Sequence, residues 1–259
     1  MMFTKAIVKK PCRALIHGIT DHPELGVPDY EHALAQHAAY VETLRALGAE
    51  VTVLEADEAY PDSCFVEDVA VLTPECAVLT RPGALSRQGE VALMRPVLEQ
   101  FYPADRIFSL TAPATLEGGD VMKAGRHFYA GLSRRTNAEG VAQLAAFLAP
   151  YGYTVTGVPF EGVLHLKTGA VYLENDLMLI KPSFEQQPAF AAYRKLLVPD
   201  AEDYAANCVW FNGRVIVPAG YPQVLAMVQA AGCETVLCDT SEYKKIDGGL
   251  SCLSLRFSV

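Results

Sequence analysis

The stretch VWFNGRVIVP, residues 209–218, predicts a β-hairpin. Its two short β-rich runs flank Asn212-Gly213, and an Asn-Gly pair between such runs favours a tight two-residue turn. Three more stretches have the same form, with a polar turn between two apolar runs: VAVLTPECAVLT (69–80), VMKAGRHFYAGL (121–132) and AVYLENDLMLIK (170–181). Their recurrence along the chain indicates an internal repeat, with connections of variable length.

A helical pattern of apolar residues follows each hairpin, and another lies near the N-terminus. The predicted stripes are Val91, Met94, Leu98 and Phe101; Val141, Leu144 and Leu148; Phe190, Tyr193 and Leu197; Val224 with Met227 or Val228; and, near the N-terminus, Leu34, Ala38, Val41, Leu44 and Leu47. Thr136 with Glu139 predicts a capping box for the second stripe. Apolar runs typical of strands follow several helices, at 50–56, 106–110, 153–158 and 235–239.

The chain therefore predicts about five strand–strand–helix–strand units. The fifth hairpin is split, so that residues 250–257 pair with the N-terminal run KAIVKKPCRALI (5–16) and close a ring, which protects the sheet edges. We expect an α/β protein, a five-bladed α/β propeller around a central channel, with residues 1–259 in a single domain. A conventional α/β sandwich with accidental regularity is the alternative that the pattern leaves open.

Composition excludes some classes of function. The net charge is −9, with 21 basic and 30 acidic residues, which argues against a nucleic-acid-binding surface. We find neither a signal peptide nor a stretch near the ~18 apolar residues of a membrane span. The seven cysteines are scattered without a C-x-x-C pair, so we expect reduced thiols and a cytoplasmic protein.

A polar or glycine-rich segment precedes each hairpin. In order these are PDSCFVED (61–68), TLEGGD (115–120), LHLKTG (164–169), AANC (205–208) and KIDGGLSC (245–252). If the units are equivalent, the segments converge near the ring axis. The candidates gathered there are Asp62, Glu67, Asp68, Glu117, Asp120, His165 and Cys252.

These residue types suit one kind of chemistry. A thiolate is a nucleophile, a histidine moves protons, and a carboxylate orients the histidine. Further carboxylates would pair with a planar cation such as a guanidinium. Arg87 and Arg135 follow hairpins and are placed to reach a substrate carboxylate. The prediction is a guanidino-substituted amino acid held at both ends, although Cys252 taken alone is more typical of a buried structural thiol.

The segments FVED, LEGGD, SRRTNAEG, HLKTG, NCVWFN and SEYKKIDGGLSCLSLRF resemble those of the dimethylarginine dimethylaminohydrolases, in the pentein or guanidino-group-modifying superfamily. The resemblance covers essentially the whole chain in order. It implies a five-bladed propeller that hydrolyses N-methylated arginine to citrulline and methylamine or dimethylamine. An arginine deiminase or amidinotransferase is the alternative within the superfamily, although both are typically longer. A non-catalytic ring that binds an amino acid or a partner is the alternative outside it.

The resemblance also implies roles for single residues. Cys252 is the nucleophile, His165 the proton shuttle and Glu117 the supporting carboxylate. Of the groups that bind substrate, Asp68 with Glu67 pairs with the guanidinium, Asp62 and the Ile19 carbonyl take the α-amino group, Arg87 and Arg135 bind the α-carboxylate, and Ile246 offers a backbone contact. Residues 19–26 form a mobile loop over the pocket.

No cofactor or metal is required, although zinc held by Cys252 and His165 would inhibit. The expected partner is a small-molecule substrate, with neither nucleic acid nor membrane, and the resemblance implies a homodimer. The other histidines, His17, His22, His32, His37 and His127, are expected on the surface or on helix faces.

Overall fold

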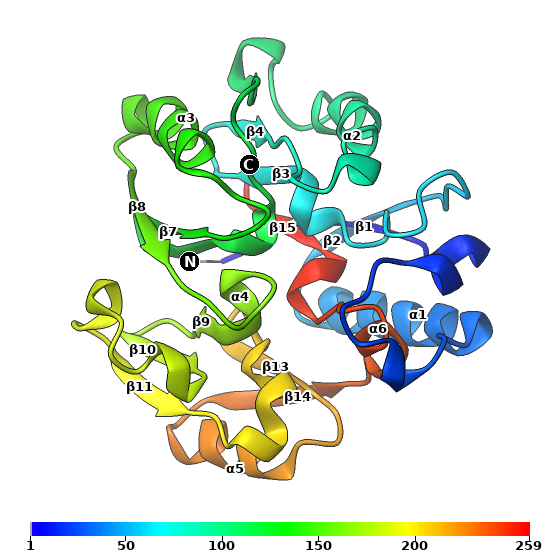
Figure 1. Cartoon of the computed structure of the whole chain (residues 1–259), viewed down its shortest axis with the longest axis vertical. Helices are drawn as coiled ribbons and strands as arrows, with labels where there is room; N and C mark the ends of the chain where they lie inside the picture. Colours follow the sequence, from blue (N-terminus) through cyan, green and yellow to red (C-terminus); the bar gives the residue numbers. More distant parts are fainter. Residues whose placement is uncertain (1) are drawn as a thin grey trace.

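Five three-stranded sheets are arranged in a ring, seen end-on in Figure 1. The computed structural model describes residues 2–259. In each sheet the first strand runs antiparallel to the second, and the second parallel to the third. The sheets are β15–β1–β2 (Leu255–Phe257, Lys5–Lys9, Glu50–Leu54), β3–β4–β5 (Ala70–Leu72, Ala77–Leu79, Ile107–Ser109), β6–β7–β8 (Val121–Ala124, His127–Leu132, Thr154–Pro159), β9–β10–β11 (Ala170–Tyr172, Leu177–Ile180, Arg194–Leu197) and β12–β13–β14 (Val209–Phe211, Arg214–Pro218, Glu234–Cys238). The predicted five-bladed α/β arrangement is confirmed.

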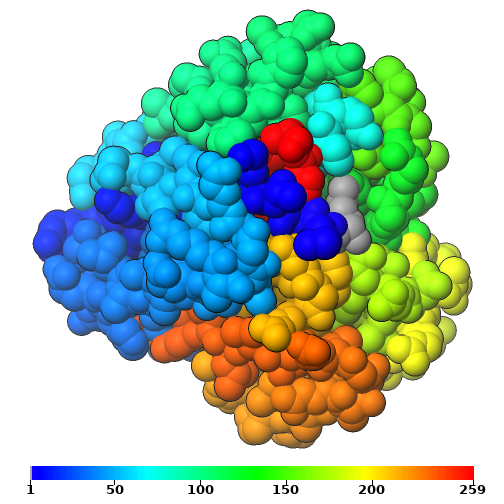
Figure 2. Space-filling model, turned by 180° about the vertical axis from the view of Figure 1, so that it is seen from behind, coloured from blue at the N-terminus to red at the C-terminus, as the bar shows by residue number. Residues whose placement is uncertain are grey.

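The two ends of the chain share one sheet. Strand β15 pairs with β1 in antiparallel register, with Lys5 opposite Phe257 and Ile7 opposite Leu255. The predicted pairing of the two chain ends is therefore confirmed. Figure 2, which views the molecule from behind, shows the N-terminal and C-terminal segments together at the centre of that face.

Helices connect the second and third strands of four sheets and lie around the outside of the ring (Figure 1). They are α1 (Tyr30–Ala46), α2 (Glu90–Leu98), α3 (Ala138–Leu148) and α5 (Pro222–Ala230), while two single-turn helices are α4 (Leu166–Gly169) and α6 (Ser241–Lys244). Parallel strands need such crossover connections. The longest helix, α1, has 17 residues, and no helix within residues 2–259 is long and apolar enough to cross a membrane.

The helix predicted from Phe190, Tyr193 and Leu197 is wrong. Residues Pro188–Phe190 form one 3₁₀ turn, and Arg194–Leu197 is strand β11, parallel to β10. Pro182 and Pro188 each begin a 3₁₀ turn in this connection. Proline removes a backbone donor and clashes inside a helix, which favours short turns here over a continuous helix.

Two local predictions need correction. The cap of α3 is Asn137, whose side chain accepts a hydrogen bond from the Gly140 N–H, whereas the Thr136 hydroxyl donates to Asp120. On α1 the buried face is also rotated from the predicted stripe, because Ala38 is exposed. The buried residues of this helix are Ala33, Gln36, His37, Tyr40, Val41 and Leu44.

His37 lies on this buried face and is only 3% exposed. Its Nε2 atom has no hydrogen-bond partner among the described residues, and burial lowers the pKa of His37 to about 4. The unfolded chain therefore binds a proton at His37 between about pH 6.5 and 4 that the folded chain does not. Stability from this residue is full above pH 6.5 and falls as the pH drops through that window.

We expect the free energy of unfolding to fall with acidification more in the native protein than in His37→Gln. His37 also bonds to the backbone of Lys9, and glutamine can donate to the same backbone group but does not titrate. From the shift of His37, the difference between pH 7 and pH 5 should be roughly 2 kcal/mol. Urea unfolding at both pH values measures it, and equal pH dependence in the two proteins would contradict the assignment.

Candidate active site

Four short helical turns meet near the centre of the ring. They are Val66–Val69, Gly118–Asp120, α4 and Ser251–Leu253, and contacts join the first turn to the second and fourth, and the second to α4. Each of the first three runs directly into the first strand of a sheet, and Ser251–Leu253 lies just before β15. The equivalent positions in the repeat therefore bring together segments that are distant in the sequence.

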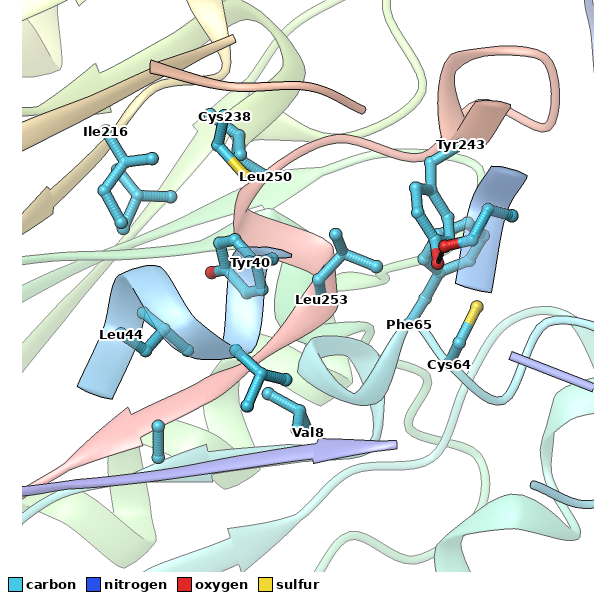
Figure 3. Close-up of a cluster of buried hydrophobic side chains, with 14 of the residues drawn as sticks. Val8, Tyr40, Leu44, Cys64, Phe65, Ile216, Cys238, Tyr243, Leu250 and Leu253 are labelled. Carbon is cyan, nitrogen blue, oxygen red and sulfur yellow. Dashed lines mark hydrogen bonds between the residues drawn. The ribbon is translucent and has the colours of Figure 1, made fainter. Parts of the chain in front are cut away.

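An apolar cluster supports the segment that carries Cys252. Leu250 and Leu253 are fully buried beside Tyr40, Phe65 and Tyr243 (Figure 3). Phe65 belongs to the segment that precedes Glu67 and Asp68, so the same cluster holds two of the converging segments.

The first glycine of the Gly-Gly pair before Cys252, Gly248, is required by close packing. A Cβ atom at this position would lie 2.4 Å from the Phe65 ring, which is closer than packed atoms come. Only glycine lets the chain pass this close to the ring.

A pocket of about 30 Å³ lies where the segments meet. Its lining is Ile19, Asp62, Phe65, Asp68, Arg87, Glu117, Arg135, Leu164, His165, Ile246, Asp247 and Cys252. All predicted site residues except Glu67 and Asp120 are in this set.

His165 and Glu117 form a buried pair. The distance between His165 Nε2 and Glu117 Oε2 is 2.7 Å, and Glu117 is fully buried. Burial opposes the charge of His165, but Asp68 and the bond to Glu117 outweigh it and raise the pKa of His165 to about 9. Burial likewise opposes the charge of Glu117, but the bond and charge of His165 lower its pKa to about 2. The pair is ionised at neutral pH, and the other ring nitrogen of His165, Nδ1, lies beside Gly119.

Cys252 is partly exposed in the wall of this pocket. Burial raises the pKa of its thiol to about 12, and the negative charges of Glu67 and Asp68 act in the same direction. The thiol is therefore protonated at neutral pH. A cation bound beside it would favour the thiolate, so the site is suited to activation by a cationic substrate.

Asp68 faces the pocket and is already paired. Its Oδ2 atom lies 2.5 Å from Arg87 Nη1, and its Oδ1 accepts the Gly119 N–H at 2.9 Å. Arg87 also donates to both oxygens of Glu90, at 3.0 and 2.9 Å. Sequence reasoning missed Glu90, although its place three residues after Arg87 is the spacing of a helical ion pair.

Arg135 makes fewer hydrogen bonds within the protein than Arg87. Its Nη1 lies 3.3 Å from Glu117 Oε1, and its side chain is 17% exposed. Arg87, by contrast, is buried, and its Nη2 also donates to the Phe65 carbonyl at 2.9 Å. Of the two arginines, Arg135 has more donors left for a bound anion.

Glu67 points away from the pocket, although it directly precedes Asp68. It accepts from Ser251 Oγ at 2.8 Å and pairs with Lys167 Nζ and Arg256 Nη2, each at 2.6 Å. It lines a second cavity of about 160 Å³ on the other side of these turns. At the pocket itself, Asp68 is the carboxylate that this segment provides.

Asp120 organises the loops around His165 instead of lining the pocket. It accepts from the hydroxyls of Ser133 and Thr136, both at 2.6 Å, and from the Leu166 N–H at 2.9 Å. Because Leu166 follows His165, these bonds hold the histidine segment against the turn that follows Glu117.

The loop at residues 19–26 is held against the pocket by two carboxylates. The Ile19 N–H donates to Asp62 Oδ1 at 2.9 Å, and the Asp21 N–H donates to Asp247 Oδ2 at 2.6 Å. Beyond the loop lies a vestibule of about 670 Å³ that also reaches Cys252 and Asp247. Sequence reasoning missed Asp247, which has a φ of +58° between Ile246 and Gly248.

One group of residues within the described chain has the spacing of a metal site. Ligand atoms of Asp68, Glu117 and His165 lie within 4.8 Å of one another. Cys252 is not a member of this group, so the expected zinc pair of Cys252 and His165 stays a prediction.

Known proteins resemble the whole chain. The N(G),N(G)-dimethylarginine dimethylaminohydrolase of Pseudomonas aeruginosa is 46% identical over 256 residues, which cover 99% of this chain and all of that protein. This chain belongs to the dimethylarginine dimethylaminohydrolase family. A family model described as "N,N dimethylarginine dimethylhydrolase, eukaryotic" matches residues 28–185. The family member of Streptomyces coelicolor is 37% identical, over 97% of this chain and 96% of its own.

Solved structures agree with this family assignment. A cysteine-to-serine variant of the Pseudomonas aeruginosa family member, in complex with citrulline, matches with a TM-score of 0.97 at 46% identity, over 99% of this chain and all of that one. The N-terminal domain of the cyanobacterial arginine dihydrolase ArgZ matches at 20% identity with a TM-score of 0.84, over 97% of this chain and 96% of that one. The second likeness shows that dimethylarginine dimethylaminohydrolases share their fold with ArgZ.

Proposed function

We propose that this protein hydrolyses Nω-methylated L-arginine to L-citrulline and dimethylamine or methylamine. The observation that carries the proposal is one pocket lined by a thiol, a charged histidine–carboxylate pair and a further carboxylate, Asp68. The names of the relatives in Pseudomonas and Streptomyces support the same activity. Asymmetric dimethylarginine and monomethylarginine are the proposed substrates.

The proposed binding mode uses both ends of the substrate. Asp68 pairs with the guanidinium beside a backbone contact from Ile246, and Asp62 with the Ile19 carbonyl takes the α-amino group. Arg135 and Arg87 bind the α-carboxylate, with Arg135 as the main donor because fewer of its N–H groups are engaged. We expect substrate to enter from the vestibule, with the 19–26 loop leaving Asp247 to admit it.

The first half of the reaction forms a covalent intermediate. When substrate binds, the Cys252 thiol loses its proton to solvent, and the thiolate, stabilised by the substrate cation, attacks the guanidino carbon. His165 is protonated at neutral pH and passes its proton to the departing amine, because a neutral amine is a far better leaving group than an amide anion. The sulfur then remains bound to an amidino carbon, and His165 is neutral.

The second half releases citrulline. Neutral His165 takes a proton from a water molecule, which attacks the amidino carbon, and the bond to Cys252 breaks. Glu117 stabilises the imidazolium each time it forms, as the carboxylate of a catalytic triad does. The urea group of citrulline forms in its protonated state and loses a proton to solvent, while the Cys252 thiolate takes one up, so both side chains return to their starting protonation states.

The experiment that tests the function measures citrulline from asymmetric dimethylarginine and, in parallel, from arginine. We expect citrulline from the methylated substrate and little from arginine. Citrulline mainly from arginine would assign the protein to the deiminase alternative. If neither compound reacts, the proposed substrate class is wrong.

Arg135 provides a test of the binding mode. In Arg135→Ala we expect KM to rise by about 10- to 100-fold, because a charge-assisted bond to a bound carboxylate is worth about 1.5–3 kcal/mol. Steady-state kinetics measures this rise. Arg45→Ala removes an exposed arginine from α1 and should leave KM unchanged. A KM for Arg135→Ala equal to that of the native protein would contradict carboxylate binding.

Three further expectations belong to the proposal. We expect a homodimer, which light scattering after size exclusion tests. We also expect inhibition by zinc through Cys252 and His165, relieved by a chelator. Among the described residues all seven cysteines are free thiols, which suits the proposed reducing cytoplasm.

A further inference from the structure

Asn207 links the segments that carry the two proposed catalytic side chains. Its Nδ2 atom donates to the Lys167 carbonyl at 2.9 Å and to Ser251 Oγ at 3.0 Å, and its Oδ1 accepts the Ser251 N–H at 2.9 Å. Lys167 follows His165 by two residues, and Ser251 directly precedes Cys252. One amide therefore joins the histidine segment to the cysteine segment.

The chemistry of these contacts requires an amide. Asparagine offers an acceptor and two N–H donors in one plane, which is what one N–H, one carbonyl and one hydroxyl need. Aspartate would keep the bond from the Ser251 N–H but would place a carboxylate oxygen against the Lys167 carbonyl. Asn207 is only 6% exposed, so water does not readily replace a lost bond.

Packing adds to the link. A Cβ atom at Gly249 would lie 2.5 Å from Asn207 Oδ1, so the cysteine segment rests directly on the amide. Asn207 also lies just before β12, the first strand of its sheet. In the other units the segments that carry the site residues occupy the equivalent position. It lines the vestibule but not the small pocket, so we expect it to act on the reaction through its neighbours.

We propose that Asn207 is a positioning residue that fixes Cys252 relative to His165. The inference rests on the proposed function. Cys252 attacks the carbon while His165 delivers a proton to the departing nitrogen, so the first step needs both groups at defined distances from one substrate. A displacement of about 1 Å between such groups costs up to about 100-fold in rate.

The test compares two leaving groups. Asymmetric dimethylarginine releases an amine, which needs the proton of His165. S-methyl-L-thiocitrulline releases methanethiolate, which leaves without one. Both substrates form the same S-linked intermediate, whose hydrolysis needs His165, so the comparison measures only the first half of the reaction, as the single-turnover rate of dimethylamine or methanethiol release. Loss of the link should therefore slow the first substrate more than the second, whereas general loosening of the fold slows both alike.

The variants are Asn207→Asp and the uncharged Asn207→Ser, with Asn212→Asp as the matched control. Asn212 also accepts one backbone N–H and donates to two carbonyls, but it does so far from the pocket, at Phe3 and Leu47. Its change to aspartate removes the same kinds of bond. The serine variant separates loss of the link from the added negative charge.

For both Asn207 variants we expect the single-turnover rate of dimethylamine release to fall at least about 10-fold, the rate of methanethiol release to fall less than about threefold, and KM for dimethylarginine to stay within about twofold. Asn212→Asp should leave all three unchanged. Equal losses with both substrates, or losses confined to Asn207→Asp, would overturn the proposal. If the native protein is inactive on dimethylarginine, the proposed function fails. The comparison then uses, in place of dimethylarginine, another arginine derivative that the protein hydrolyses with release of an amine.

Discussion

Replacing Cys252 with serine is expected to lower kcat for citrulline formation by at least ~10⁴-fold, since loss of a covalent nucleophile in other hydrolases costs about 10⁶-fold. An alcohol ionises far less readily than a thiol. The carboxylates of Glu67 and Asp68, which already raise the pKa of the thiol, also disfavour an alkoxide at this position. The substitution changes one atom, so the fold should be retained.

Measuring citrulline at saturating substrate gives the loss, and thermal unfolding checks the fold. Cys233→Ser is the control, because Cys233 is also partly exposed but packs in a different cluster, beside α5. Calorimetry should still detect substrate binding to Cys252→Ser. Residual activity within tenfold of the native protein would remove Cys252 from the role of nucleophile.

Replacing Glu117 with glutamine is expected to lower kcat by about 10²- to 10⁴-fold, by analogy with loss of the carboxylate in a catalytic triad. The amide is close in shape but carries no charge to stabilise the His165 imidazolium. The pKa of His165, about 9 in the native protein, should fall, because the bond and charge of Glu117 help to raise it.

The same substitution should also shift the pH profile of activity in a defined direction. Amine release needs protonated His165, so activity declines as the pH rises through the pKa of that residue. In Glu117→Gln the decline should therefore begin at lower pH than in the native protein. Glu139→Gln, at an exposed residue of α3, is the control and should match the native profile. An unchanged profile in Glu117→Gln would contradict the proposed coupling.

The sequence predicted the elements whose signals are local. Alternating apolar residues and turn dipeptides such as Asn212-Gly213 define a hairpin within a dozen residues, and the backbone at both positions has the positive φ that this turn needs. The segment at 188–197 failed because apolar spacing alone does not distinguish a helix from a turn followed by a strand. Its partner, β10, lies outside the window in which periodicity is read.

The sequence by itself determined which chemical groups are present and, through the repeat, that their segments meet near one axis. Only the tertiary structure decided where each group points. Glu67 and Asp68 are neighbours in one turn, yet opposite sides of that turn bind them: Lys167 and Arg256 hold Glu67, while Arg87 and Gly119 hold Asp68. The bonds of Asn207 to Lys167 and Ser251 likewise join segments about 40 residues away along the chain. Side-chain direction and charge pairing depend on such distant partners, which the spacing of residues in a sequence does not record.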